Sequence, residues 1–249
     1  MSDTIVIIPT YNEKENIENI ISAVFALPQS FDILIIDDGS PDGTADIVKN
    51  LQKTNSERLF LVQRTGKLGL GTAYIAGFKW ALERDYQYII EMDADFSHPP
   101  KDLLNLYAAC ASEADVAVGS RYVNNLVSVV HWPLGRILMS YFASKYVQFI
   151  TGLKVKDTTA GFVCYRRNVL ETFDLDAIKF KGYAFQIEMK FTAYKYGFKI
   201  IEVPIIFINR ELGVSKMSGG IFSEALFGVI SLKIRSLFKK YKLKDNSNN

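Results

Sequence analysis

The amino-acid sequence predicts an α/β protein in which helices cover both faces of a mostly parallel β-sheet. Five short, almost purely apolar runs occur before residue 120, and helix-like stretches separate them. Such runs are typical of parallel strands that are buried on both sides. The composition is that of an ordinary globular chain, with 49% hydrophobic and 22% charged residues in 249. These observations exclude a disordered or repetitive chain.

The first part of the sheet is expected from apolar runs of strand length. They occupy residues 5–8, 33–36, 59–62, 88–92 and 116–118, and helices are expected at 16–25, 44–52, 72–84 and 101–111. Ligands of such sheets bind at the carboxyl ends of the strands. The residues that follow each run are therefore the first candidates for a functional site.

The pattern changes after residue 122. Apolar residues recur at helical spacing over 134–151, which predicts an amphipathic helix. Residues 161–165 and 200–208 resemble strands, and 185–196 resemble a helix. From Ile221 an apolar helix runs into a basic segment, and residues 245–249 are expected to fray. We therefore expect one domain over residues 1–220, followed by a C-terminal apolar and basic helix with its tail over 221–249.

Composition and charge exclude further classes of protein. The net charge of +2 and the pI near 8.3 do not favour nucleic-acid binding. Cys110 and Cys164, the two cysteines, cannot form a disulfide framework and are expected in the core. His98 and His131 stand apart from other soft ligands, so zinc is not expected. Without a long apolar run or a basic leader, the chain is expected to be cytoplasmic.

Two carboxylates lie directly after the fourth apolar run, in Asp93-Ala94-Asp95. A turn that begins at Ala94 would let both carboxylates face one ion, and oxygen ligands of this kind suit Mg²⁺ or Mn²⁺. The alternative is a solvated turn whose acids cap the next helix. The buried run before the motif and the acids after the other runs favour the metal site.

A second acidic turn, Asp37-Asp38-Gly39-Ser40, follows the second run. One interpretation is a carboxylate that accepts hydrogen bonds from a nucleobase or ribose. The other is a plain turn with a helix cap. The sequence has no G-x-G-x-x-G after the first run, no P-loop and no G-x-S-x-G. A dinucleotide dehydrogenase, an NTPase and a hydrolase with a serine elbow are therefore not expected.

Several cations lie in polar or amphipathic surroundings, where they would suit a phosphate. They are Arg121, Arg136, Arg210 and Lys216. The segment 210–216 also holds Gly213 and Ser215, which make it flexible and rich in hydrogen-bond donors. The alternative for each arginine is a simply solvated side chain.

Taken together and in order, these motifs resemble the family 2 glycosyltransferases of the GT-A fold. Pro9-Thr10-Tyr11-Asn12-Glu13, Asp37-Asp38-Gly39-Ser40 and Asp93-Ala94-Asp95 carry the resemblance. A finer resemblance, to the dolichyl and polyprenyl-phosphate mannose synthases, rests on motifs at 38–44, 67–74, 92–100, 119–122, 182–189 and 210–216. The resemblance implies a GT-A (Rossmann-like) sheet flanked by helices, with interfacial helices near the C-terminus.

The resemblance also implies a reaction and its participants. GDP-mannose would be the donor and a polyprenyl phosphate the acceptor, with inversion to a β-linked mannosyl phosphate. Asp93 and Asp95 correspond to the site of Mg²⁺ or Mn²⁺, although Ser97 replaces a glutamine that helps to bind the metal in some relatives. The alternatives are a transferase with UDP-glucose or another nucleotide sugar, acting on a lipid phosphate or glycan, and a non-catalytic nucleotide-sugar-binding protein.

The resemblance assigns roles to further residues. The donor-binding positions correspond to Pro9, Tyr11, Glu13, Asp38, Lys67 and Asp93. The acceptor-phosphate positions correspond to Ser120, Arg121, Arg136, Arg210 and Lys216, and the catalytic residues to Asp95, Arg121 and Arg210.

A lipid acceptor requires access to a bilayer. The helix at 134–151 and the basic, apolar C-terminus would suit an anionic membrane surface, and this also accounts for 13% aromatic residues in a chain without a span. We therefore expect peripheral attachment to the cytoplasmic face of a membrane. The alternative is that the helix packs into the core and the tail is only solvated. The sequence leaves open whether the protein needs a membrane-anchored protein partner.

Overall fold

The first half of the protein alternates strands and helices, as expected. The computed structural model describes residues 2–123, 127–182, 184–209 and 221–242. Its first elements are β1 (Thr4–Thr10), α1 (Ile17–Phe25), β2 (Asp32–Asp37), α2 (Thr44–Asn55), β3 (Leu59–Gln63), α3 (Leu70–Leu82), β4 (Tyr88–Glu91), η1 (Pro100–Asp102), α4 (Leu103–Ser112) and β5 (Val116–Ser120). All five strands and all four α-helices expected before residue 120 are confirmed.

The second half is more irregular. It comprises β6 (Val129–Val130), α5 (Leu134–Thr151), β7 (Val163–Arg166), α6 (Arg167–Thr172), η3 (Leu175–Ala177), α7 (Ala184–Tyr196), β8 (Ile200–Pro204), β9 (Phe207–Ile208) and α8 (Ile221–Phe238). The helix predicted over 134–151 is confirmed at those bounds. The tail expected to fray, 245–249, lies outside the described residues.

The main sheet has the strand order β3-β2-β1-β4-β7-β5-β8 in the described part of the chain. All neighbouring pairs are parallel except the two that involve β7, which runs antiparallel to β4 and β5. A small parallel sheet joins β6 to β9. Because β7 is reversed, its first residues lie at the same edge as the carboxyl ends of its neighbours. This reversal brings the segment before β7 to the candidate site.

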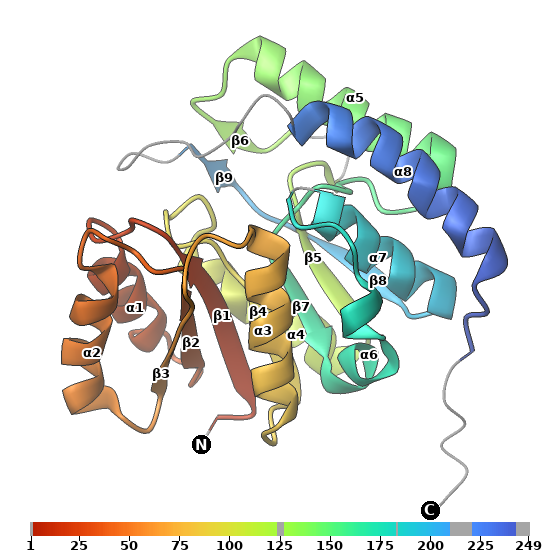
Figure 1. The fold of residues 1–249 in the computed structure, drawn as a ribbon. Coiled ribbons are helices and arrows are strands. Elements are labelled where there is room, and N and C mark those ends of the chain that lie inside the picture. The colour runs from red at the N-terminus through yellow and green to blue at the C-terminus, as the bar shows by residue number, and fades with distance from the viewer. Residues whose placement is uncertain (1, 124–126, 183, 210–220, 243–249) are drawn as a thin grey trace, which may run out of the picture.

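The strands of the sheet are buried on both faces, which explains their unbroken apolar sequence. In β1, Ile5 and Ile7 pack into a core with α3, α6 and α7. Val6 and Ile8 point the other way, into a core with α1, α2 and α4. Figure 1 shows these helices on the two sides of the sheet. Alternation along each strand therefore supplies both hydrophobic layers.

Helices α5 and α8 lie side by side at one end of the molecule (Figure 1). Val147 of α5 and Val229 of α8 are buried in a third apolar cluster with Phe191 of α7. The Tyr146 hydroxyl also donates to the carbonyl of Leu226 at 2.7 Å. The two helices are thus attached to the sheet domain through α7. Within the described residues, no helix is long and apolar enough to span a membrane.

Two expectations from the sequence need comment. The continuous strand expected over 200–208 is wrong, because β8 ends at Pro204 and β9 pairs with β6 in the small sheet. The Ile205 N–H still donates to the carbonyl of Ser120, the last residue of β5, but the Phe207 N–H donates to the carbonyl of Ser128, next to β6. The placement of Cys110 and Cys164 in the core is confirmed, since both are fully buried.

Candidate active site

The first candidate group gathers at the ends of β1 and β2. The buried Asp37 carboxylate accepts hydrogen bonds from the hydroxyls of Thr10 at 3.0 Å and Ser40 at 2.5 Å, which ties the two strand ends together. The Asp38 carboxylate instead accepts from Nε of Arg64 at 2.6 Å. Arg64 also donates to the Thr72 hydroxyl at the start of α3. These contacts fix the loop 64–72 against the acidic turn.

The other predicted donor-binding residues lie around this loop. Pro9 is in the last part of β1, and Tyr11 and Glu13 follow it. The Lys67 ammonium lies 5.3 Å from the centre of the Tyr11 ring. The backbone N–H of Glu13 donates to the hydroxyl of Thr44, at the first residue of α2. The structure therefore brings the expected donor-binding residues to one edge of the sheet.

The carboxylates of Asp93 and Asp95 lie in the turn after β4, as expected. The Asp93 side chain is 38% exposed, whereas Asp95 is nearly buried. The Asp95 carboxylate accepts the backbone N–H of Ser97 at 3.0 Å. Nδ1 of the buried His98 accepts the backbone N–H of Asp93 at 3.3 Å. Burial lowers the pKa of His98 to about 4, so its ring is a neutral acceptor at physiological pH.

These carboxylates form a suitable donor set for a hard divalent cation. Mg²⁺ is usually held by one or two carboxylates together with waters and substrate phosphates. Among the residues that the structure describes, no group of three or more histidine, cysteine or acidic side chains is gathered as a closed cage. Two carboxylates, one of them exposed, are the kind of donors that such a cation takes, and a phosphate substrate would supply further ligands.

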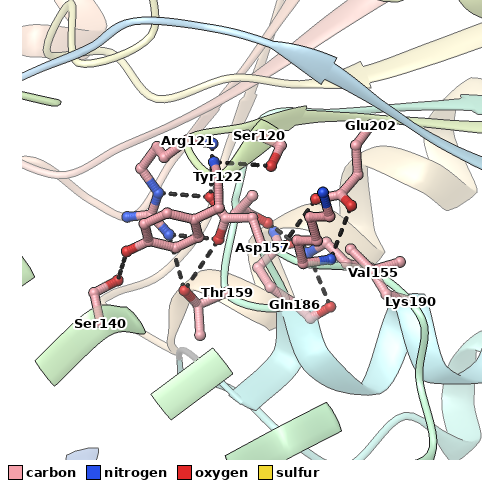
Figure 2. Close-up of polar contacts among 12 residues, drawn as sticks. Ser120, Arg121, Tyr122, Ser140, Val155, Asp157, Thr159, Gln186, Lys190 and Glu202 are labelled. Atoms are coloured by element: carbon pink, nitrogen blue, oxygen red, sulfur yellow. Dashed lines mark hydrogen bonds and ion pairs between the residues drawn. The ribbon is translucent and has the colours of Figure 1, made fainter. Parts of the chain in front are cut away.

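Arg121, directly after β5, is held by a buried carboxylate (Figure 2). Its Nε donates to Oδ2 of Asp157 at 2.7 Å, and its Nη2 donates to Oδ1 at 2.6 Å. Nη2 also donates to the Thr159 hydroxyl. Burial alone would raise the pKa of Asp157, but the charge and hydrogen bonds of Arg121 lower it below its usual range. The pair is therefore ionised.

Arg136 and Arg121 both lie against the ring of Trp132. The guanidinium carbon of Arg136 is 4.0 Å and that of Arg121 is 5.3 Å from the ring centre of Trp132. Nη1 of Arg136 donates to the side chain of Asn209 at 3.0 Å. Ser120 is buried, and its hydroxyl accepts the backbone N–H of Tyr122. Two of the predicted phosphate-binding cations are thus together, and Ser120 adjoins them within the protein.

The remaining predicted cations cannot be placed. Arg210 and Lys216 lie outside the described residues, so their contacts are not part of the site described here.

A series of buried, hydrogen-bonded polar side chains connects the two parts of the site. Nε2 of Gln186 donates to Glu91, the last residue of β4, at 2.8 Å. The Lys190 ammonium donates to the carbonyls of Gln186 and Ala160 (Figure 2). Burial raises the pKa of Glu91 to about 8 and lowers the pKa of Lys190 to about 8. The series connects the strand that precedes Asp93 to the turn that carries Asp157.

No role is expected from the sequence for Trp132 or Asp157, and none for Arg64, although Arg64 follows the third apolar run. The expected site residues follow strands, whereas Asp157 precedes the antiparallel β7. The segment Asp157-Thr158-Thr159-Ala160-Gly161 is rich in turn-forming and polar residues, and that composition is the signal that would have indicated it. Arg64 had a weaker signal, since its partner Asp38 is 26 positions away.

A family model identifies the protein class. The model described as glycosyl transferase family 2 matches residues 5–173, which include the acidic turns, Arg121 and Asp157. The chain belongs to glycosyl transferase family 2. It is accordingly a glycosyltransferase, and the resemblance drawn from its motifs is confirmed.

Two curated relatives are similar over almost the whole chain. One is a polyprenol monophosphomannose synthase of Mycolicibacterium smegmatis, 48% identical over 93% of this chain and 87% of the relative. The other is an undecaprenyl-phosphate mannosyltransferase of Micrococcus luteus, 46% identical over 90% of each chain. Both names describe transfer of mannose to a polyprenyl phosphate.

A solved structure supports the fold. A mannosyltransferase from Pyrobaculum calidifontis, in complex with GDP-mannose and Mn²⁺, matches with a TM-score of 0.61 at 19% identity. The match covers 97% of this chain and 66% of that one, just under two thirds of its length. At this identity it bears on the fold alone. The α/β GT-A architecture predicted from the sequence is confirmed.

Proposed function

We propose that this protein transfers mannose from GDP-mannose to a polyprenyl phosphate, with inversion, and releases polyprenyl-phosphate mannose and GDP. The observation that carries the proposal is the placement of two kinds of group at one edge of the sheet. The acidic turns after β2 and β4 suit a nucleotide diphosphate with its cation, and Arg121 with Arg136 suits a second phosphate. The names of the two close relatives support mannose as the transferred group and a polyprenyl phosphate as the acceptor.

The donor is assigned to the edge formed by β1, β2 and β4. Tyr11, Glu13, Asp38 and Lys67 are assigned to the nucleotide, and Asp93 is assigned to its diphosphate. Mg²⁺ or Mn²⁺, held by Asp93 and Asp95, would stabilise the negative charge on the departing GDP. The Pyrobaculum calidifontis mannosyltransferase, which shares the fold, is in complex with GDP-mannose and Mn²⁺, the same donor and kind of cation.

The acceptor is assigned to Arg121 and Arg136, with Arg210 and Lys216 as further cations. A phosphate monoester has a second pKa near 6, so it is already an anionic nucleophile near pH 7. It needs no strong general base. The arginines attract the phosphate through their charge and hydrogen-bond donors, and they hold it in line with the anomeric carbon, which lowers the entropic barrier to attack.

The lipid tail is assigned to the surface made by α5 and α8, here called the helical platform. Large apolar side chains on it face solvent, including Leu134, Phe142, Phe149, Phe227, Leu237 and Phe238, the last 86% exposed. Such exposure marks an interaction surface. Lys239, Lys240 and Lys242 follow α8. The protein therefore binds peripherally to an anionic membrane through this platform.

Electrostatic attraction and insertion of apolar side chains each contribute only modestly to membrane binding. Each lysine or arginine near an anionic surface contributes about 1 kcal/mol before screening by salt. An apolar side chain that inserts completely adds roughly 1.5–3 kcal/mol. Together they place the protein where the polyprenyl phosphate is presented.

A transfer assay with a donor panel tests the proposed function. Purified protein is mixed with Mg²⁺ or Mn²⁺, polyprenyl phosphate in detergent, and radiolabelled GDP-mannose, UDP-glucose or UDP-N-acetylglucosamine. We expect organic-phase label from GDP-mannose alone. Label from UDP-glucose would identify a different donor, and the absence of lipid-linked label with all donors would refute the proposal.

A further inference from the structure

The Nε–Nη2 edge of the Arg121 guanidinium is occupied by the protein's own carboxylate. We propose that Asp157 is a positioning residue that fixes the direction in which Arg121 presents its charge to the acceptor phosphate. The inference rests on the proposed function, because it gives Arg121 the acceptor phosphate as its ligand. Neither the sequence motifs nor the family match assigns a role to Asp157.

The geometry between the two side chains leaves Arg121 one orientation. Asp157 accepts three hydrogen bonds from Arg121, from the backbone N–H at 3.0 Å, from Nε at 2.7 Å and from Nη2 at 2.6 Å. Asp157 is fully buried and Arg121 is 7% exposed. A guanidinium is planar, so two parallel bonds on one edge set both its plane and its direction.

Aromatic rings close the space around the same guanidinium. Its central carbon lies 5.4 Å from the ring centre of Tyr122, 5.3 Å from that of Trp132 and 5.6 Å from that of Phe207. The Tyr122 hydroxyl is in turn bonded to Ser140 on α5 at 2.8 Å. Rotation of Arg121 to another rotamer would have to displace these rings.

The turn that carries Asp157 is itself anchored on two sides (Figure 2). The carboxylate of Glu202, on β8, accepts the backbone N–H groups of Lys156 at 2.8 Å and Asp157 at 2.9 Å. On the other side, the ammonium of Lys190 on α7 donates to the carbonyl of Ala160 at 2.5 Å. Asp157 is therefore attached to the sheet and to α7, which makes it a rigid support for Arg121.

The negative charge of Asp157 affects acceptor binding and alignment in opposite ways, so the two effects can be separated by measuring kcat and KM. The Asp157 carboxylate partly neutralises Arg121 and so weakens its attraction to an anion. Replacement by asparagine keeps the shape and removes that opposing charge. Acceptor binding should therefore survive in D157N, whereas alignment for attack should be lost. The expected result is a lower kcat with little change in the KM for polyprenyl phosphate.

The experiment is a double-mutant cycle on the full chain with GDP-mannose and polyprenyl phosphate. Wild type, D157N, R121A and the double variant are compared. Calorimetric titration with GDP-mannose gives the fraction of each preparation that binds donor, and kcat is expressed per binding site. D32N is the matched control, because Asp32 is also fully buried but bonds Tyr86 near Arg58 at the opposite end of the sheet.

We expect D157N to lower kcat at least tenfold with the acceptor KM within threefold, and to change kcat less than twofold in the R121A background. D32N should keep the wild-type kcat per site. If R121A does not fold, R121Q, which retains donors for Asp157, provides the second background with the same expectation.

Three results would overturn the inference. They are a wild-type kcat in D157N, an equal effect of D157N with and without Arg121, or an equal loss in D32N. Wild-type protein that binds GDP-mannose but makes no lipid-linked mannose would refute the proposed function, and this inference with it. That outcome is recognised from the wild-type arm alone, so the two failures are distinguishable.

Discussion

Asp93 and Asp95 differ in their surroundings although only one residue separates them. Asp93 is partly exposed and Asp95 is almost buried against the Ser97 backbone. If they hold the cation, D95N should lower transfer by roughly 10²–10³-fold, the magnitude usual for loss of one group that stabilises developing charge. Removal of metal with EDTA should have the same effect, reversibly.

The control for Asp95 is D102N. Asp102 is also a buried carboxylate, and it accepts a hydrogen bond from the side chain of Asn105 on α4. D102N should retain transfer, and circular dichroism should show folded protein for both variants. Full turnover of EDTA-treated wild type would contradict the assignment of the metal site.

Arg136 stacks on Trp132 at 4.0 Å and bonds Asn209. R136K keeps the charge but removes the planar fork, so acceptor-dependent transfer should fall about tenfold, since a hydrogen bond to a charged group contributes about 1.5–3 kcal/mol. Binding of GDP-mannose, measured by calorimetry, should not change. R84K is the matched control, because Arg84 stacks on Trp80 at 3.5 Å away from the candidate site. Equal losses in both variants would indicate a general stacking effect.

At the scale of single residues, the sequence identified groups that follow parallel strands and missed those that depend on long-range pairing. Asp38 and Asp95 come directly after buried runs, so local pattern was sufficient. Asp157 acquires its role from Arg121, 36 positions earlier, and from the reversal of β7. Neither the pairing nor the reversal is encoded in a local pattern.

The helix α3 packs closely on β1 through a glycine. A Cβ at Gly77 would lie 2.7 Å from Cγ2 of the buried Ile7, whereas a Cβ at Gly135 on α5 would meet nothing within 4 Å. G77A should destabilise the protein by about 1–3 kcal/mol through overpacking. G135A should be neutral or stabilise by up to about 1 kcal/mol through helix propensity. Urea denaturation measures both, and equal effects would contradict this account of α3 packing.

The helical platform of α5 and α8 makes a prediction about membranes. F142E/F149E adds two charges to exposed apolar positions, at 62% and 87% exposure, and should abolish sedimentation with anionic liposomes. N50E/T54E adds the same charges to exposed positions on α2, far from α5 in Figure 1, and should bind as wild type does. Binding of both variants, or failure of wild type to bind, would contradict the proposed attachment.

At the scale of elements, most of the fold was predictable from periodicity. The strands and helices before residue 120 follow from apolar runs, and the helix Leu134–Thr151 from its helical spacing. The structure of residues 200–208 was not predictable in this way. The strand-like sequence continues across Pro204, but β8 pairs in the main sheet and β9 pairs with β6 in the small sheet. Local propensity indicates that a segment is extended, but not which strand it pairs with.

Lys190 is an ionisable side chain buried within the protein near the site, and its titration makes the free energy of unfolding depend on pH. Burial lowers the pKa of Lys190 from 10.5 to about 8, although Glu91 and Asp157 favour its charged form. Between these two values the unfolded chain holds a proton that the folded protein has released. The free energy of unfolding should therefore rise with pH in this window, by up to about 1.4 kcal/mol per pH unit.

The matching variant is K190M, which removes the titrating group. The stability of wild type relative to K190M should increase from pH 8 to pH 10 and change little between pH 6.5 and pH 7.5. Urea denaturation at these values measures the difference. A difference that stays flat or falls above pH 8 would show that the folded protein keeps Lys190 charged.

The central claim, inverting transfer of mannose to a lipid phosphate, is tested most directly by the chemistry of the product. Wild-type protein is incubated with GDP-[1-¹³C]mannose, polyprenyl phosphate and Mg²⁺ or Mn²⁺, and the lipid product is examined by NMR. We predict a β-configured anomeric carbon coupled to one phosphorus, with one GDP released for each mannose transferred. An α-configured product, or mannose released to water without a lipid phosphodiester, would contradict the account.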